Sequence, residues 1–406
     1  MLALAACCAG CGPAGDGDGG VDLAVAVADP HLVYPAPHPA GPQDEKGTGT
    51  VLSSPKIVPI VFSGDPALPS IQAFTGALGA SDYWRATTAE YGVAAATASA
   101  PIVVSPTEIG ATMTVKDIET FLATHLDGTH AGWPTPDASS IYILFFPTGI
   151  TVQNGSVTSN SCVNFNGFHH AAKVGGLTVA YAVIPRCVGF ASLTGDDAFT
   201  VPASHELIEA ATDPFTERAF ARIDQDHTVW NLFPAGELAD LCDVDSDAVY
   251  KPAGLGFAVQ RSWSNAAVLA GLGPCVPVPD GNVYFAAVPV LTDDVDITAS
   301  NFTGDLSGTT KGVQIPLGES RTIDLALFST ASLAAPFRVS MSDVPALQGG
   351  AEELTFVLDV PSGVNGDILH ATITRIKNGS IGGTQFAVKA TGGTKTFHYW
   401  FGYAAN

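Results

Sequence analysis

Ser204–Pro214 is the stretch of this chain whose residue types and spacing could support chemistry. It reads Ser-His-Glu-Leu-Ile-Glu-Ala-Ala-Thr-Asp-Pro and contains the pattern His-Glu-x-x-Glu. In the His-Glu-x-x-His signature of zinc peptidases, both histidines bind the metal and the inner glutamate is the general base. Because Glu209 stands at the position of the second histidine, we expect His205 and Glu209 to bind a divalent cation and Glu206 to act as the catalytic base.

The ionisable side chains of this stretch share one face if the stretch is helical. At about 100° per residue they span about 100° of arc, and the apolar residues lie on the other side. Asp213-Pro214 would end the helix, because proline disfavours helical backbone in the residue before it. An amphipathic helix with a solvated acidic face is the alternative interpretation. Against it, the stretch contains no Lys or Arg that would offset repulsion among its carboxylates.

A second acidic pair follows at Glu237 and Asp240. Thermolysin-like peptidases take their third ligand from a Glu on a later helix, and an Asp shortly after it orients a ligand His. Glu237 and Asp240 resemble that pair, although they are three residues apart rather than four. We therefore expect Glu237 as third ligand, with Asp240 and Asp213 as hydrogen-bond partners of the ligands. A surface role for Glu237 is the alternative.

The expected set of ligands has one His and two Glu. It therefore contains more hard oxygen ligands than the usual set of two His and one Glu. Such a set admits zinc, which we expect first, and also manganese or calcium. His169, shortly after Cys162, could polarise a substrate carbonyl or join the metal ligands, while His170 and His227 are weaker candidates. Asp243–Asp247 has the acidic spacing of a calcium loop but lacks its glycine, so a polar turn is expected there.

The composition predicts a folded, acidic protein. Of 406 residues, 46% are hydrophobic and 14% charged, which is typical of globular rather than disordered chains. Acidic residues outnumber basic ones by 39 to 17, and no Lys/Arg cluster occurs, which argues against a nucleic-acid partner. No Gly-x-Ser-x-Gly motif occurs, which argues against a serine hydrolase. We expect a monomer.

The first residues resemble a bacterial lipoprotein signal. Leu4-Ala5-Ala6-Cys7 resembles a lipobox, in which the Cys is lipidated, and Cys11 is a second candidate. The sequence thus predicts an extracytoplasmic protein, either secreted or a lipoprotein of the outer membrane or cell surface. The lipid would be its only membrane attachment, because no other stretch approaches the roughly 20 apolar residues of a spanning helix.

Four further cysteines agree with export, because an even number is expected in an oxidising compartment. Three pairings are open to them. Proximity in the sequence favours Cys162 with Cys187 and Cys242 with Cys275. Each bond would contribute about 3 kcal/mol of stability. A zinc site made of the four thiolates is disfavoured, since no Cys-x-x-Cys pair exists among them.

The pattern along the chain predicts three parts. Residues 1–50 are expected to be the signal segment and a flexible, Gly/Pro-rich tether. Residues 51–279 alternate apolar strand-like runs with helical patterns, which favours an α/β domain with a zincin-like layered core and the candidate metal site. Residues 280–406 contain seven short strand-like runs separated by Gly, Pro and Asn, which favours an immunoglobulin-like β-sandwich.

Several blocks of the chain together resemble a known family. In order they are Lys56–Gly64, Ser81–Tyr91, Cys162–His170, Ala203–Pro214, Glu237–Cys242 and Trp263–Cys275. This order is similar to uncharacterised secreted bacterial proteins with a His-Glu-x-x-Glu…Thr-Asp-Pro motif, metallopeptidase-like and distantly similar to the plant Exordium, or phosphate-induced, proteins. The plant proteins keep a Thr-Asn-Pro end but lack the His-Glu pair. The resemblance implies an extracytoplasmic scaffold on which the metal site is optional.

Two functions follow from these features. The first is a metal-dependent hydrolase, in first place a peptidase that acts on peptides or proteins. The second is a non-catalytic cell-surface protein that binds a glycan or another protein and keeps a structural or vestigial metal site. In the first hypothesis the metal ligands must surround one point beside an open cleft.

Overall fold

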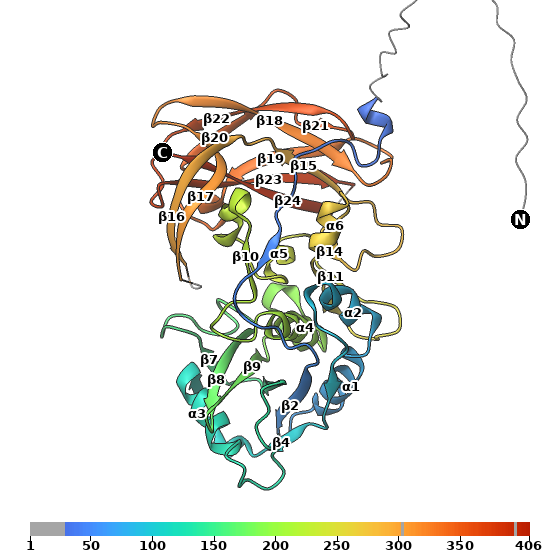
Figure 1. Cartoon of the computed structure of the whole chain (residues 1–406), viewed down its shortest axis with the longest axis vertical. Helices are drawn as coiled ribbons and strands as arrows, with labels where there is room; N and C mark the ends of the chain where they lie inside the picture. The colour runs from blue at the N-terminus through green and yellow to red at the C-terminus, as the bar shows by residue number, and fades with distance from the viewer. Residues whose placement is uncertain (1–28, 302–303, 394–395) are drawn as a thin grey trace, which may run out of the picture.

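Continuous apolar runs form the centre of a six-stranded sheet in the lower half of the molecule (Figure 1). The computed structural model describes residues 29–301, 304–393 and 396–406. Three central strands are parallel, namely β2 (Lys56–Phe62), β6 (Ser140–Phe146) and β9 (Leu177–Pro185). Almost all of their residues are buried, as expected for a parallel sheet covered on both faces. The order is β3-β2-β6-β9-β8 with β4 beside β2, where the outer strands are β3 (Thr97–Ala98), β4 (Ile102–Val104) and the antiparallel β8 (Phe168–Val174).

Helices cover both faces of this sheet. Three helices share one core with inward residues such as Ile57 and Val61, and a fourth packs on the other face beside Val58 and Ile60. The fourth helix begins with a capping box, since Thr114 Oγ1 accepts a hydrogen bond from the Asp117 amide at 3.2 Å. The helices are α1 (Leu68–Leu78), α2 (Asp82–Thr88) and α4 (Asp197–Thr212) on the first face and α3 (Val115–His125) on the second.

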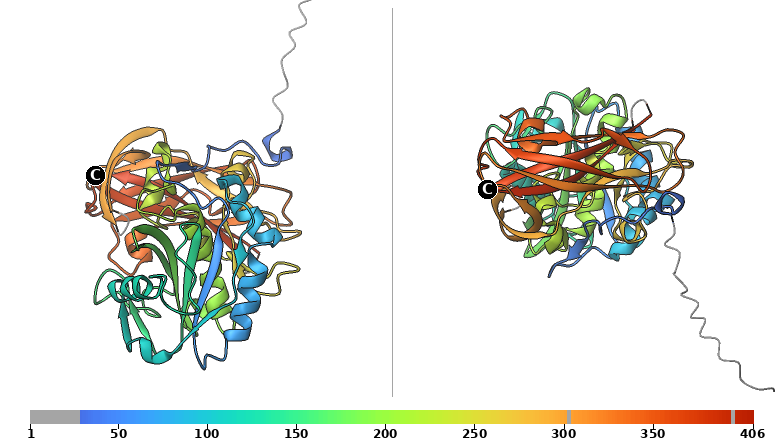
Figure 2. Two further views of the ribbon diagram at one scale, coloured as in Figure 1. Left: turned by 60° about the horizontal axis from the view of Figure 1, so that its bottom comes forward. Right: turned by 90° about the horizontal axis from the view of Figure 1, so that it is seen from above.

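Two further sheets face each other in the upper half of the molecule, and Figure 2 shows their strands lying over the lower half. A hydrophobic core that includes Phe337, Ile373 and Phe386 fills the space between them. One sheet has the order β15 (Phe285–Pro289), β18 (Ser320–Ser329), β22 (Ile368–Arg375) and β20 (Leu354–Leu358). The other has the order β16 (Asp293–Asn301), β17 (Gly304–Gln314), β24 (Thr396–Ala405), β23 (Gly383–Gly392), β19 (Phe337–Asp343) and β21 (Ser362–Gly363).

Short strand pairs and helices fill the region between the halves and the rim of the lower sheet. The pairs are β1 (Asp44–Lys46) with β10 (Phe220–Ile223), β5 (Thr112–Thr114) with β7 (Thr151–Gln153), β11 (Val249–Tyr250) with β12 (Val259–Gln260), and β13 (Ser262–Trp263) with β14 (Cys275–Val276). The short helices are α5 (Asp240–Asp243), α6 (Asn265–Leu269) and α7 (Val344–Leu347). Residues 29–50 were expected as tether, yet they include β1 and the buried side chains of Ala36 and Asp44.

The expected fold class is wrong. Strands make up 36% of the chain and helices 21%, and the described residues form seven sheets, so the protein is dominated by β-structure and has no α/β zincin-like core. The C-terminal part also differs from a seven-stranded immunoglobulin-like domain, because its described residues form ten strands and include a parallel pair, β17 with β24. Short strands such as β1 and β10 pair although they lie far apart in the sequence, with Asp44 opposite Ile223, and local periodicity carries no signal for such pairing.

Both predicted disulfides are confirmed, since Cys162 is bonded to Cys187 and Cys242 to Cys275. Disulfides persist in oxidising compartments, so the protein is extracytoplasmic. Within the residues described, no helix is long and apolar enough to cross a membrane. The expected lipidation site, Cys7, lies outside the described residues, as does Cys11.

One hydrophobic cluster joins the two halves. Trp230 packs against Trp263, at 5.5 Å between ring centroids, and against Phe401 of β24, at 4.9 Å. Beside this cluster, His398 Nδ1 lies 3.0 Å from Asp245 Oδ2, and both side chains are buried. The polar contact therefore connects the segment after α5 with the last strand of the chain.

Asp245→Asn is expected to lower the free energy of unfolding by about 2–3 kcal/mol, because a buried charged partner of His398 is lost. Urea unfolding followed by fluorescence measures the change. The matched control is Asp324→Asn, which breaks an exposed contact with His370 and should cost less than about 0.5 kcal/mol. Equal losses for the two variants would show that the junction does not depend on Asp245.

Candidate metal centre

Helix α4 brings the first three candidate residues together. His205, Glu206 and Glu209 lie on its C-terminal half, and α4 begins at Asp197, so that Pro202 is inside the helix. Glu206 is 6% exposed and Glu209 is 2% exposed. The alternative of a solvated acidic face is therefore wrong. Carboxylates buried this deeply require compensating charge or hydrogen bonds.

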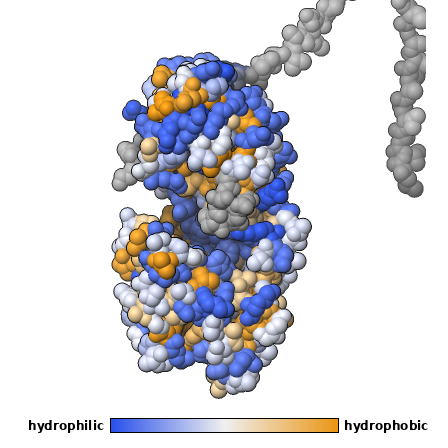
Figure 3. Space-filling view, turned by 90° about the vertical axis from the view of Figure 1, so that its left-hand side faces the viewer, coloured by the Kyte–Doolittle hydropathy of each residue, from blue (hydrophilic) through white to orange (hydrophobic). Residues whose placement is uncertain are grey.

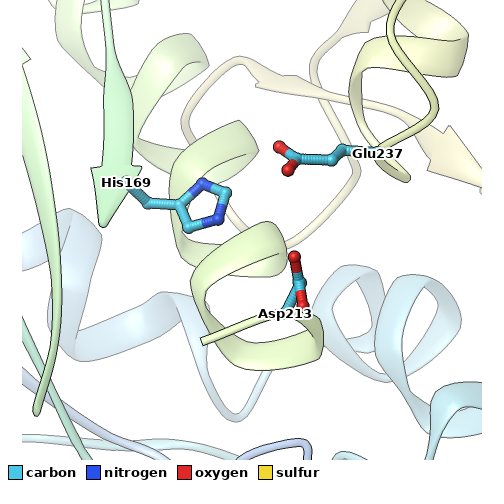
Figure 4. Close-up of side chains that lie close together, drawn as sticks. All are labelled: His169, Asp213 and Glu237. Atoms are coloured by element: carbon cyan, nitrogen blue, oxygen red, sulfur yellow. The ribbon is translucent and has the colours of Figure 1, made fainter. Parts of the chain in front are cut away.

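Three overlapping groups of side chains surround the end of α4. In each group, the potential ligand atoms lie within 4.8 Å of one another. Glu209 belongs to two groups and His169 to two, so the three form one continuous cluster. The first group is His205, Glu209 and Asp240, the second is His169, Glu206 and Glu209, and the third is His169, Asp213 and Glu237, which Figure 4 shows pointing toward one another.

The first group is built around His205. Its Nε2 lies 3.1 Å from Glu209 Oε2 and 3.3 Å from Asp240 Oδ1. Its Nδ1 lies 3.1 Å from Gln260 Oε1, and the Gln260 amide nitrogen donates to the carbonyl of Ala239 at 2.8 Å. That second bond orients the amide of Gln260 so that its oxygen faces the ring. Nδ1 then carries the hydrogen, which leaves the Nε2 lone pair free for a ligand.

The carboxylate of Glu209 is held in one orientation. Its Oε1 accepts hydrogen bonds from the backbone amides of Ala239 at 3.1 Å and Asp240 at 3.2 Å. Its Oε2 faces the two histidines, at 3.1 Å from His205 Nε2 and 3.5 Å from His169 Nδ1. The loop that leads into α5 thus fixes the oxygen that the first two groups share.

Glu206 extends from α4 toward the start of β8. Its Oε2 lies 3.4 Å from His169 Nδ1. Gly167, just before β8, makes room for it, because a Cβ on that glycine would lie 2.6 Å from Glu206 Oε1. Any larger residue at position 167 would displace the glutamate. The Gly167-Phe168-His169 segment therefore positions two of the three members of the second group, His169 and Glu206.

Glu237 occupies a different place from the one expected. It lies with His169 and Asp213 in the third group. Asp240 takes the position that was expected for Glu237, beside His205 and Glu209. Arg218 Nη1 donates to Asp213 Oδ2 at 2.7 Å and also to Glu237 Oε1. The other oxygen of Asp213 accepts from the Ala219 amide at 2.6 Å. Arg218 therefore supplies the positive charge for this group.

Sequence analysis missed two members of the cluster, Asp44 and Arg218. Asp44 is 2% exposed, and burial together with the charges of Asp213 and Glu237 raises its pKa well above the usual range. No local signal marks Asp44, because β1 reaches the site only by pairing with β10. Arg218 could have been found as the first basic residue after the acidic helix.

The weaker candidates lie outside the cluster or at its edge. His170 Nε2 contacts Asn154 Oδ1 at 3.1 Å, and burial with the nearby His169 lowers the pKa of His170 to about 4. His227 pairs with Asp224 at 2.8 Å. The acidic residues after α5 face His398 and Arg261, and Asp245, Asp247 and His398 form a separate group whose potential ligand atoms lie within 4.8 Å of one another.

The cluster carries more negative charge than its arginine can offset. Burial alone would lower the pKa of His205, but Glu209 and Glu206 outweigh it and raise the pKa well above the usual value. Burial and the charge of Glu209 raise the pKa of Asp240 to about 8. Without a bound cation, the site therefore retains protons on groups such as these.

The metal-free protein is expected to lose stability as pH rises from about 6.5 to about 8, the range between the usual pKa of His and the raised pKa of Asp240. Asp240 has a raised pKa in the folded state, and so does His205. The folded protein therefore holds protons that the unfolded chain has released, and the free energy of unfolding falls as pH rises through the folded pKa values. The midpoint of thermal unfolding in EDTA should fall by at least about 3 °C over this range. Asp240→Asn should reduce the change, and a midpoint that rises with pH would contradict this charge balance.

Solvent reaches the cluster at Asp240 and Arg218, whose side chains are 23% and 38% exposed, whereas that of Glu209 is 3% exposed. Figure 3 shows the side of the molecule on which β16 and β17 lie above β7 and β8. A hydrophilic hollow indents this side between the two halves. The strand that carries His169, β8, lies on the same side (Figure 1).

Comparisons with known proteins add little to this geometry. No family model and no curated protein matches the chain. Among solved structures, surface layer protein SbsC domains 1–6 has a TM-score of 0.17 and 17% identity, covering 29% of this chain and 13% of that one. SbsC domains 4 and 5 has a TM-score of 0.17 and 13% identity, covering 37% and 81%. A TM-score of 0.17 does not indicate a common fold, and the chain spans only 13% of the first of these structures. The resemblance to Exordium-like proteins stays a prediction.

Proposed function

We propose that this protein is a metal-dependent hydrolase whose cation is held by His205, Glu209 and Asp240. The observation that carries the proposal is the first group, in which Nε2 of His205 lies 3.1 and 3.3 Å from two carboxylate oxygens. Ligands of a tetrahedral zinc ion with bonds of about 2.0–2.2 Å are about 3.3–3.6 Å apart. The separation of 3.3 Å falls within this range and that of 3.1 Å lies just below it, so a small outward shift of these atoms would admit a cation between them.

The charge of the cluster supports the same proposal. Six carboxylates surround the end of α4, and Arg218 bonds to two of them, Asp213 and Glu237. They are Asp44, Glu206, Glu209, Asp213, Glu237 and Asp240. Burying so many carboxylates without counter-charge is costly. Imidazole and carboxylate ligands suit zinc first and manganese second.

The neighbouring side chains fit the roles of a hydrolytic site. A cation in the first group would polarise a substrate carbonyl and acidify a water molecule. Glu206 has a free oxygen, Oε1, that can accept the proton of the attacking water. Gln260 orients His205, and His169 holds Glu206 in place. We take peptides as the first substrates to test, in keeping with the His-Glu pair on α4.

Metal analysis and peptide hydrolysis test this function. The purified chain, loaded with zinc or manganese, should retain metal after desalting and hydrolyse a peptide mixture. Glu206→Gln should lower kcat by at least about 100-fold while a cation stays bound at His205. Glu217→Gln, which changes an exposed carboxylate just beyond α4, is the matched control and should leave both unchanged. A chain that retains no cation after loading would refute the proposal.

A non-catalytic protein with a structural cation is the second candidate, and the deep burial of Glu209 favours it. Here the metal would stabilise the junction around α4 and a surface elsewhere would bind a glycan or a protein. Metal that raises the unfolding temperature, together with ligand binding that survives His205→Ala and no hydrolysis, would support this candidate.

We also propose lipid attachment at Cys7, because its surroundings resemble a lipobox. The described chain starts beside the sandwich, where His31 Nε2 lies 3.1 Å from Asp367 Oδ1. Mass spectrometry of the N-terminal peptide tests the attachment.

A further inference from the structure

We propose that this centre holds two cations, with Glu209 as the ligand that both share. The first is the cation of the proposed function, on which this inference rests. The second would lie in the second group, between His169 Nδ1, Glu206 Oε2 and Glu209 Oε2.

The position of Glu209 Oε2 is the first reason. This oxygen lies 3.1 Å from His205 Nε2 on one side and 3.5 Å from His169 Nδ1 on the other. The other oxygen, Oε1, is occupied by two backbone amides. Oε2 is therefore the oxygen that remains for cations, and it faces both histidines.

The surroundings of Glu206 are the second reason. Its side chain is more than nine-tenths buried, and its one hydrogen-bond partner among the described residues is His169, at 3.4 Å. A buried carboxylate with so few partners carries a large desolvation cost. A cation between Glu206 and His169 would remove that cost. The separations of 3.4 and 3.5 Å also suit two ligands of one ion, for which about 3.3–3.6 Å is expected.

The third group explains why the second cation belongs with Glu206. Asp213 and Glu237 already share a positive charge, because one nitrogen of Arg218 donates to both. Within the part of the chain that the structure describes, no Lys or Arg forms an ion pair with Glu206 or Glu209. The carboxylates that no Lys or Arg offsets are thus in the first and second groups.

Two cations that share a carboxylate change the chemistry of the site. In two-metal hydrolytic sites the ions lie about 3.5–4 Å apart and stabilise both the attacking and the leaving oxygen. Glu206 would bind the second ion through Oε2 and keep Oε1 for the proton of the attacking water. Its role as proton acceptor is therefore compatible with its role as ligand.

Metal stoichiometry of the full chain tests the inference. Native mass spectrometry after loading with zinc or manganese should give two ions per chain for the wild type and for Glu217→Gln. Glu206→Gln and His169→Gln should each retain one. Manganese-loaded wild type should show the electron paramagnetic resonance spectrum of two coupled ions, and both variants the spectrum of a single ion.

The outcomes separate this inference from the proposed function. One ion per chain in the wild type and in Glu206→Gln would overturn the shared-ligand centre and leave the hydrolase proposal standing. No ion in the wild type would overturn both. Thermal unfolding of the metal-free variants identifies any that fail to fold, and because His169→Gln leaves Glu206 in place, the two variants test the site independently.

Discussion

Glu209→Gln is expected to abolish cation binding and hydrolysis. Gln retains the size of Glu209 but places a neutral amide between His205 and His169. For the wild type, a cation at about 100 times its Kd should raise the free energy of unfolding by about 2.7 kcal/mol, and this gain should vanish in the variant. Loss of a residue that only hydrogen-bonds to a metal ligand already lowers metal affinity or activity by about 10–100-fold. Loss of a ligand itself should therefore lower kcat/KM by more than about 100-fold.

Thermal unfolding with and without zinc measures this effect, alongside the rate of peptide hydrolysis. Glu217→Gln is the matched control, because it makes the same chemical change on an exposed side chain just beyond α4. The Glu217 carboxylate accepts a hydrogen bond from the hydroxyl of its neighbour Thr216 and belongs to none of the three groups. This control should retain the full zinc-dependent gain. A zinc-dependent gain that persists in Glu209→Gln would place the cation elsewhere.

Arg375→Ala is expected to cause the largest loss of stability, about 4 kcal/mol. Arg375 ends β22 and is fully buried. Its guanidinium donates to the carbonyls of Ile315, at 2.7 Å, and Ala405, at 3.0 Å, and to the hydroxyl of Thr384, at 3.0 Å. It therefore joins one sheet of the sandwich to the end of β24 in the other. Truncation would leave these buried acceptors without a donor.

Arg321→Ala is the matched control for this prediction. Arg321 lies on β18, which pairs with β22, but its side chain is exposed and contacts Glu319. Its removal should change the free energy of unfolding by less than about 0.5 kcal/mol. Urea unfolding measures both variants, and similar losses would show that the buried hydrogen bonds of Arg375 do not hold the sheets together.

Local features of the fold were predictable where neighbours in the sequence make the contacts. The run Lys56–Phe62, one of the apolar strand-like runs in residues 51–279, forms β2, and Thr114 caps α3 through Asp117. In contrast, the fold class was mistaken. The β-structure that dominates the protein includes pairs such as β1 with β10 and β17 with β24, whose strands are distant in the sequence. Pairing between distant strands leaves no trace in the local periodicity of either one.

The candidate site shows the same division. The spacing of His205, Glu206 and Glu209 places them on one part of a helix, so their proximity follows from the sequence. Whether Glu237 or Asp240 lies beside these three residues does not follow from the sequence. That outcome depends on the loop before α5, whose backbone amides donate hydrogen bonds to Glu209, and on Arg218, which binds Glu237.

Sequence alone was sufficient for the helix with its acidic residues, because that depends on short-range spacing, and proximity in the sequence favoured the two disulfide pairings that form. Tertiary structure placed His169 between the second and third groups, added Asp44 and Arg218 to the site, and buried its carboxylates. Burial makes the difference in chemistry: the same glutamates on a solvated helix would be ordinary surface charges, whereas in the interior they need protons or cations.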